Sequence, residues 1–170
     1  MKEVFFDPNE LIVSKTDLTG RITYANALFC EVCGYRFKEL MGQQHSIVRH
    51  ADMPRAVFKL LWDRLALRHE VFAFVKNRTK QNDFYWVFAH ITPSINSKGE
   101  VVGYHSARRA PDHDLIRTHV EPLYRQLIEE ERSQTNRKQG LIRSSALLER
   151  VVADNAVSYD DFVFKIKGAA

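Results

Sequence analysis

The sequence contains little cysteine and no long apolar run, and both absences restrict the class of protein. Two cysteines in 170 residues, Cys30 and Cys33, are too few for the disulfide framework of a small secreted domain. No run of about 18 apolar residues is present, so we expect no membrane-spanning helix. The acidic residues Glu3 and Asp7 interrupt the N-terminus where a secretory signal would have its apolar core. We therefore expect a cytoplasmic protein.

The chain also lacks the charge clusters and residue sets of several functional classes. Its net charge is +4, but the basic residues are spread among acids and form no run interleaved with aromatics, so we expect no nucleic-acid binding. A peripheral contact with an anionic membrane remains open. Cys30 and Cys33 lie in a predicted helix without a second Cys/His pair at zinc spacing, which favours core packing over redox or metal chemistry. The sequence shows no nucleophile–base pair that would indicate an enzyme, so we expect none.

Hydrophobic periodicity predicts an α+β domain over residues 9–110, preceded by an N-terminal cap, residues 1–8, and followed by a helical extension, residues 111–170. Asn26 is a plausible cap for a helix that ends at Gly34, and a second helix should follow Pro54. Strands are predicted at Leu11–Ser14, Arg21–Ala25, Val71–Val75, Phe84–Ile91 and Val101–Ala107, with hairpin loops at 77–82 and 96–99.

The extension should contain two helices joined by a polar hinge at 133–140. The first helix is predicted at Leu123–Arg132, and the second from an apolar stripe at Leu141, Ser145, Leu148 and Val152. This second helix either packs back on the domain or serves as a dimer or receptor-docking helix. No element is assigned to Ser158–Ala170.

A cluster of charge and imidazole lies just before the helix that follows Pro54. Arg49 is a fixed cation whose planar fork suits a phosphate, a pyrimidine carbonyl or an anionic ring. On residue type alone, the simpler interpretation is that Arg49 pairs with Asp52, or that Asp52 caps the following helix. Residue types alone therefore favour a structural role for this cluster.

The run Val48-Arg49-His50-Ala51-Asp52-Met53-Pro54, together with Gly34-Tyr35, resembles the flavin-binding PAS domain of the Aer energy-taxis receptor family. The resemblance covers about residues 15–125 and implies a PAS fold, in which short helices cover one face of a five-stranded antiparallel sheet. It also implies noncovalent FAD, although the sequence does not distinguish FAD from FMN. The cofactor-binding residues that it implies are Arg49, His50, Asp52, Trp62, Asn77, Asn26 and Phe58.

Each implied role has a simpler alternative. Trp62 would stack on or edge the flavin ring, or is a core tryptophan. Asn77 offers the donor and acceptor that fit the ring's O4 and N3–H edge, or is a hairpin-turn asparagine. His50 would tune redox potential or proton uptake, or packs by a hydrogen bond. Asn26 is a helix cap first and a ligand contact second.

The sequence departs from the resembled family in two places. Val71-Phe72-Ala73 stands where that family has Trp-Ser-Gly, so an aromatic side chain is absent or displaced to Phe72. The receptors continue into a membrane anchor and a signalling coiled coil, whereas this sequence ends. We therefore expect a stand-alone sensor similar to the CetB type, held near the inner membrane by a chemoreceptor or signalling partner, or else a fragment of a larger receptor. Homodimerisation is also open.

Other functions compete with a flavin redox sensor. A cofactor-free PAS module would use its sheet face and C-terminal helix for dimerisation or partner binding. A haem-binding oxygen sensor would use His45, His50 or His69 as axial ligand. A flavin oxidoreductase would need a substrate channel and turnover. No cysteine stands in the motif that light-sensing relatives use for a photoadduct.

Overall fold

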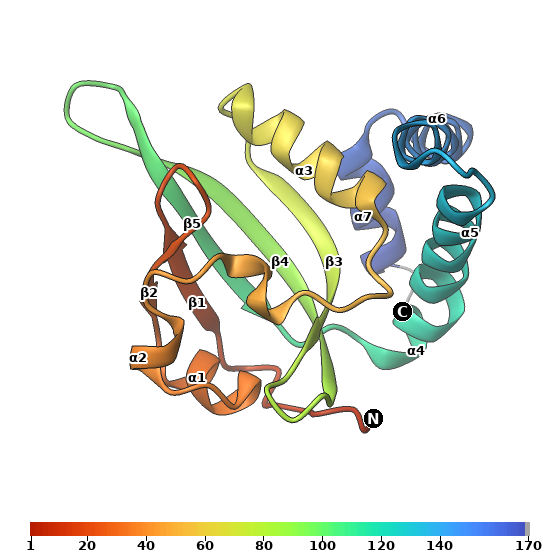
Figure 1. Ribbon diagram of the computed structural model, residues 1–170. Helices are drawn as coiled ribbons and strands as arrows, with labels where there is room; N and C mark the ends of the chain where they lie inside the picture. The colour runs from red at the N-terminus through yellow and green to blue at the C-terminus, as the bar shows by residue number, and fades with distance from the viewer. Residues whose placement is uncertain (169–170) are drawn as a thin grey trace. The chain divides into compact units, whose positions relative to one another are not determined.

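The computed structural model describes residues 1–168, which belong to two compact units (Figure 1). The first unit comprises residues 1–51 and 65–110, and the second comprises residues 52–64 and the chain from Pro111 onward. The run from Arg49 to Asp52, which the sequence presents as one cluster, is therefore divided between the two units.

The first unit is built on the predicted five-stranded antiparallel sheet. Its strands are β1 (Ile12–Thr16), β2 (Ile22–Ala25), β3 (Val71–Arg78), β4 (Phe84–Ile95) and β5 (Val101–Arg109). They lie in the order β2-β1-β5-β4-β3. In this order β1 and β5, the first and last strands in sequence, are neighbours. Paired residues of the two strands therefore place their side chains on the same face of the sheet. Gly103 of β5 allows the close approach, since a Cβ there would collide with the Thr16 carbonyl.

Strands β3 and β4 are longer than predicted, and this corrects the placement of Asn77. We expected a hairpin loop from Asn77 to Asn82, but β3 continues to Arg78 and Asn77 pairs with Tyr85. The turn is tighter because the Thr79 hydroxyl accepts from the Gln81 and Asp83 backbone N–H groups. Asn77 is consequently a buried strand residue, not a turn asparagine.

Short helical segments follow β2 in the first unit (Figure 1). They are α1 (Ala27–Cys33), α2 (Phe37–Leu40) and the 3₁₀ turn η1 (His45–Val48). The predicted caps of α1 are confirmed: the Asn26 side chain accepts from Phe29 N–H, and Gly34 ends the helix at a φ of 73°. The same Asn26 oxygen accepts from Val13 N–H, and its Nδ2 donates to the Leu11 carbonyl.

The second unit is helical and adds elements to those predicted for the C-terminal region. Its segments are most of α3 (Arg55–Ala66), then α4 (His113–Leu115), the π turn η2 (Ile116–Val120), α5 (Glu121–Arg132), α6 (Arg137–Asn155) and α7 (Tyr159–Gly168). The segment that we left unassigned contains α7. Helix α6 is longer than its predicted stripe because Asn136 caps it, which shortens the hinge.

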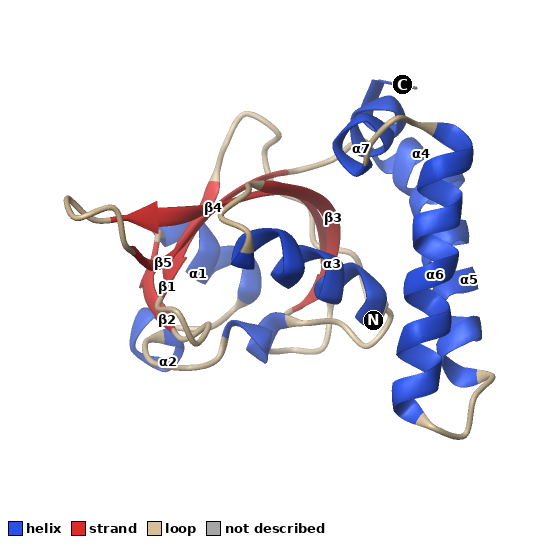
Figure 2. Ribbon diagram, turned by 90° about the horizontal axis from the view of Figure 1, so that it is seen from above, coloured by secondary structure: helices blue, strands red, loops and turns tan. Residues whose placement is uncertain are grey.

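Helices α5 and α6 lie side by side, as both views show (Figure 2). The buried face of α6 is Gly140, Ser144 and Leu148, so of the predicted stripe only Leu148 is buried. Gly140 permits the contact, since a Cβ there would collide with the Glu131 carbonyl. The Glu131 carboxylate accepts from Ser144 and pairs with Arg55 at 2.9 Å. The close approach of the α6 backbone at Gly140 to the α5 backbone at Glu131, more than apolar periodicity, determines which face of α6 is buried.

None of the helices among the described residues is both long enough and apolar enough to cross a membrane.

Replacing Asn26 by Ala should lower the free energy of unfolding by about 2 kcal/mol, because three backbone groups lose their side-chain partner. Asn26→Asp isolates one contact, since its carboxylate still accepts from Val13 and Phe29 but sets an oxygen against the Leu11 carbonyl, so its cost reports the loss of that donor. Urea unfolding followed by circular dichroism measures both. Wild-type stability in the Ala variant would contradict the assignment.

Candidate functional site

A set of polar side chains lies on one face of the central sheet. Ser14 of β1 pairs with Ser106 of β5, and Arg108 stands two residues further along the same strand. Residues two apart share a face of a sheet, and so do residues paired across strands. Arg108 pairs with Ala89, which shares its face with Tyr85. We call this the inner face, because α1 covers it at Phe29, whose ring lies 4.9 Å from the Arg108 guanidinium.

The guanidinium of Arg108 is the centre of this set. It is 3% exposed and donates from Nε to Ser106 Oγ at 2.9 Å. Its Nη2 donates to Ser14 Oγ and, at 2.9 Å, to His45 Nε2. One buried cation therefore joins β1, β5 and η1 through three side-chain acceptors.

His45 is held neutral by this arrangement. Burial, and then the Arg108 charge, lower the pKa of His45 to about 3. The residue as a whole keeps some solvent exposure, but its ring stacks on Phe29 at a centroid distance of 5.7 Å, and its Nε2 is occupied. Because Nε2 accepts from Arg108, the ring proton belongs on Nδ1.

Two donors on the inner face are not satisfied by the protein. Among the described residues, Arg108 Nη1 has no hydrogen-bond partner although it is buried, and the buried Tyr85 hydroxyl has the Asn77 side chain near it but outside hydrogen-bonding geometry. Burial raises the pKa of the Tyr85 hydroxyl well above its usual value, and Arg108 and the Asn77 side chain offset this only in part. A buried donor without an acceptor costs about 1–3 kcal/mol, so these two groups are suited to an acceptor from outside the protein.

The structure brings three of the predicted site residues together. Arg49 and Asn77 form an isolated antiparallel bridge, which places the segment after η1 beside β3. The His50 N–H lies 3.4 Å from the Lys76 carbonyl in the same contact. Asn77 is 4% exposed, and its pairing with Tyr85 puts it on the inner face. The segment after η1 therefore contacts β3 at Arg49, His50 and Asn77, three of the residues predicted from the sequence.

His50 is itself packed within the first unit. The side chain is 6% exposed; its Nε2 lies 3.2 Å from the Met1 sulfur and its ring meets Phe84 edge to face at 6.0 Å. The N-terminal segment that brings Met1 there pairs with the start of β4, where Val4 N–H donates to the Phe84 carbonyl. These contacts match the simpler interpretation of His50 as a packing histidine.

The other predicted residues belong to other elements. Asp52, Phe58 and Trp62 belong to the second unit, where Asp52 precedes α3 and the other two lie on it. Trp62 is 44% exposed, so it is not a core tryptophan. The Asn26 amide is occupied by three backbone groups, which is the capping role that the sequence favoured.

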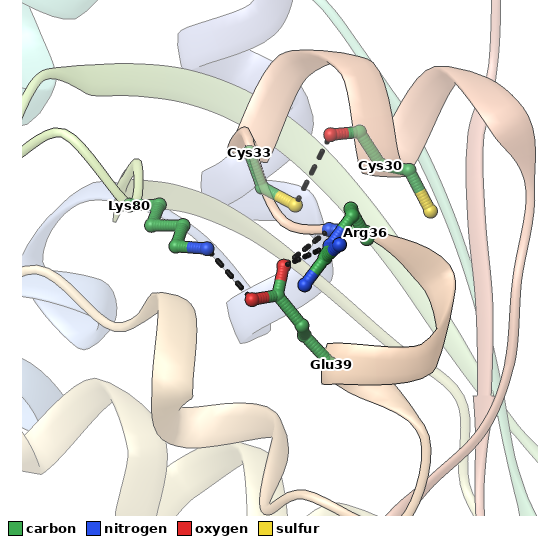
Figure 3. Close-up of polar contacts among 5 residues, drawn as sticks. All are labelled: Cys30, Cys33, Arg36, Glu39 and Lys80. Carbon is green, nitrogen blue, oxygen red and sulfur yellow. Dashed lines mark hydrogen bonds and ion pairs between the residues drawn. The ribbon is translucent and has the colours of Figure 1, made fainter.

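The cysteines show no redox pairing (Figure 3). Both thiols are free; Cys33 Sγ lies 3.7 Å from the Cys30 carbonyl, and burial raises the pKa of Cys33 to about 11. Next to them, Lys80 donates to Glu39 at 2.7 Å, and this contact, followed by the Arg36 N–H, lowers the pKa of Glu39 to about 2. The cysteines are thus protonated packing groups beside a surface ion-pair cluster.

The group around Arg108 was missed from the sequence because its members are distant in the chain. Ser14, His45, Ser106 and Arg108 belong to no local motif, and only the fold brings them together. The available signal was the alternation of β5, where Ser106 and Arg108 share a face and Arg109 does not. Because Arg108 and Arg109 are adjacent at the end of β5, the sequence did not indicate that either of them is buried.

No group of three or more His, Cys, Asp or Glu side chains among residues 1–168 is arranged to hold a metal ion. Of the histidines considered as axial haem ligands, His45 has its Nε2 hydrogen-bonded to Arg108, and His50 has its Nε2 beside Met1. His69 is exposed.

Comparison with known proteins identifies relatives of both the sequence and the fold. A model of the PAS fold matches residues 12–106. The aerotaxis receptor of Escherichia coli (strain K12) is 44% identical over 117 residues, which are 68% of this chain and 22% of the receptor. A nitrogen fixation regulatory protein of Klebsiella pneumoniae is 31% identical over 97 residues, 57% of this chain and 20% of that protein. The chain thus spans about a fifth of the length of these relatives.

Solved structures agree with the predicted fold. A light-oxygen-voltage domain studied with a flavin analogue superposes with a TM-score of 0.58 at 16% identity, over 68% of this chain and 87% of that one. The light state of the blue-light photoreceptor Aureochrome1 LOV gives 0.56 at 19% identity, over 66% and 88%. At these identities the likeness shows the fold alone, and it confirms the predicted sheet with its helices.

The neutral, buried His45 predicts a pH dependence of stability. Its pKa is lower in the folded than in the unfolded chain, so the unfolded chain binds more protons below about pH 6.5, and stability should fall as pH falls toward 4. The loss should reach about 1 kcal/mol per pH unit. Urea unfolding at several pH values measures it. His45→Gln should flatten the dependence of the unfolding free energy on pH. His69→Gln, at an exposed site, should leave that dependence unchanged. Equal slopes of free energy against pH in the two variants would contradict the assignment.

Proposed function

The chain belongs to the PAS family, and from that premise we propose that it is a redox sensor that binds FAD noncovalently against the inner face of its sheet. The observation that carries the proposal is the pair of buried, unsatisfied donors, Arg108 Nη1 and the Tyr85 hydroxyl. A flavin ring presents carbonyl oxygens and ring nitrogens as acceptors along one edge, so the residues present fit such a group. The relationship to an aerotaxis receptor supports the choice of cofactor.

Several residues of the first unit would hold the cofactor. Asn77 reaches the inner face from β3 and provides both a donor and an acceptor for a ring edge. Arg49, bridged to it through the backbone, supplies a cation for a carbonyl or phosphate oxygen. His50, packed beside the same bridge, fixes the position of this segment. When bound, FAD would supply electron acceptance.

Signalling would follow from a change in these contacts. A change of charge at the cofactor alters which hydrogen bonds Arg49 and Asn77 make. Because these residues join the segment after η1 to β3, the bridge and the sheet would shift together. A relay of this kind needs two states that differ in partner affinity, with a coupling of about 1–3 kcal/mol. The protein would signal without catalytic turnover.

The partner that we propose is a membrane chemoreceptor or another signalling protein. The relative from Escherichia coli is named as an aerotaxis receptor, and this chain corresponds to about a fifth of it. The remaining functions of such a receptor would come from other segments or from a partner. Binding at the cytoplasmic face of the inner membrane would then depend on that partner.

The purified protein should show a flavin absorption spectrum, and heat should release FAD, identified by chromatography. Arg49→Ala should lower flavin occupancy by weakening the affinity about tenfold or more, because a charge-assisted contact is worth about 1.5–3 kcal/mol. Arg109→Ala, the same change at an exposed site, is the control and should bind normally.

Full occupancy in Arg49→Ala would remove Arg49 from the site. A Soret band would indicate haem instead. A colourless protein that takes up no added FAD would leave a cofactor-free interaction module.

A further inference from the structure

The Arg108 guanidinium is a buried cation without an anionic partner. No carboxylate pairs with it within residues 1–168, and its three acceptors, Ser14, Ser106 and His45, are all uncharged. The neighbouring ionisable groups are Tyr85 and Cys33, and burial raises the pKa of both, so neither supplies a negative charge near neutral pH. The site therefore contains a net positive charge on the inner face.

Such a charge is costly in the absence of compensation. An isolated ion inside a protein loses several kcal/mol of hydration, and hydrogen bonds to neutral acceptors recover only part of that. Burial lowers the pKa of Arg108 to about 10, yet this leaves the guanidinium protonated near pH 7. Its Nη1 carries two further N–H donors that no described residue accepts. Both the charge and these donors would be satisfied by one electron-rich group.

We propose that Arg108 is a direct contact of the bound cofactor, with Nη1 donating to an oxygen or nitrogen of the flavin ring, and that it favours the ring's negatively charged reduced form. This inference rests on the proposed function and assigns a role to a residue outside the predicted site. The ligand class is a planar heteroaromatic ring with carbonyl oxygens that gains negative charge on reduction.

The charge balance explains the preference. Uptake of two electrons and one proton leaves one negative charge on the ring, and uptake of a second proton removes it. In vitro the electrons come from dithionite. A fixed guanidinium in a low-dielectric interior stabilises the charged form more than the neutral oxidised ring. Arg108 would therefore couple the redox state of the cofactor to Ser14 and His45, which share its Nη2.

The test compares FAD binding by the wild-type chain with binding by Arg108→Met, Arg108→Lys and Arg109→Met. Met removes the charge at similar volume, and Lys keeps the charge but lacks the planar fork. Arg109 is the matched control, because it is the next residue on the strand, is exposed and faces the other way. Titrations with oxidised FAD and with dithionite-reduced FAD give two dissociation constants, and circular dichroism checks the fold of each variant.

In Arg108→Met, the affinity for reduced FAD should fall about tenfold or more relative to the affinity for oxidised FAD. For a two-electron couple, tenfold corresponds to a midpoint potential lowered by about 30 mV. Arg108→Lys should show a smaller loss of the same sign, and Arg109→Met should match wild type. If Arg108→Met fails to fold, Arg108→Lys decides.

An unchanged ratio of the two constants in the Arg108 variants, with wild-type FAD binding intact, would overturn the preference that we assign to Arg108, while the measured FAD binding would itself support the proposed function. If both constants also equal those of wild type, Nη1 does not contact the ring; if both are weakened equally, the contact stands and the preference for the reduced form is overturned. Failure of the wild-type chain to bind either form of FAD would overturn both.

Discussion

The burial of the Arg108 charge is the constraint on which the inner face of the sheet depends. One guanidinium draws acceptors from β1, β5 and η1, segments that are far apart in the chain. None of those acceptors can be cationic, since a second positive charge beside a buried guanidinium is costly. Burial, and then the Arg108 charge, lower the pKa of His45, whose ring stacks on Phe29.

The first unit was predictable because its signals are local. Asn26 as a cap, Gly34 as a helix end and the alternation of the strands each depend on a few neighbouring residues, and all were found. The predicted loop position of Asn77 was wrong, because the composition of residues 77–82 suggested a longer loop than the turn that the Thr79 hydroxyl stabilises. In the second unit, the face of α6 depends on Gly140 against a carbonyl of α5, which apolar periodicity cannot express.

The candidate site divides in the same way. Resemblance identified Arg49 and Asn77, and the fold brings them into one backbone bridge. It did not identify Arg108, because a motif records residues that are near in sequence. The inner face is assembled instead from single residues on separate strands. Burial and hydrogen-bond accounting can find such residues, since they ask which polar atoms lack a partner.

Arg108 and Arg109 are adjacent residues of one type, and only their faces differ. A slip of β5 by one residue that put Arg109 in the place of Arg108 would also put Ala107 in the place of Ser106. Alanine offers the guanidinium no acceptor. The hydrogen bonds of the guanidinium therefore favour the observed register of β5 over this alternative.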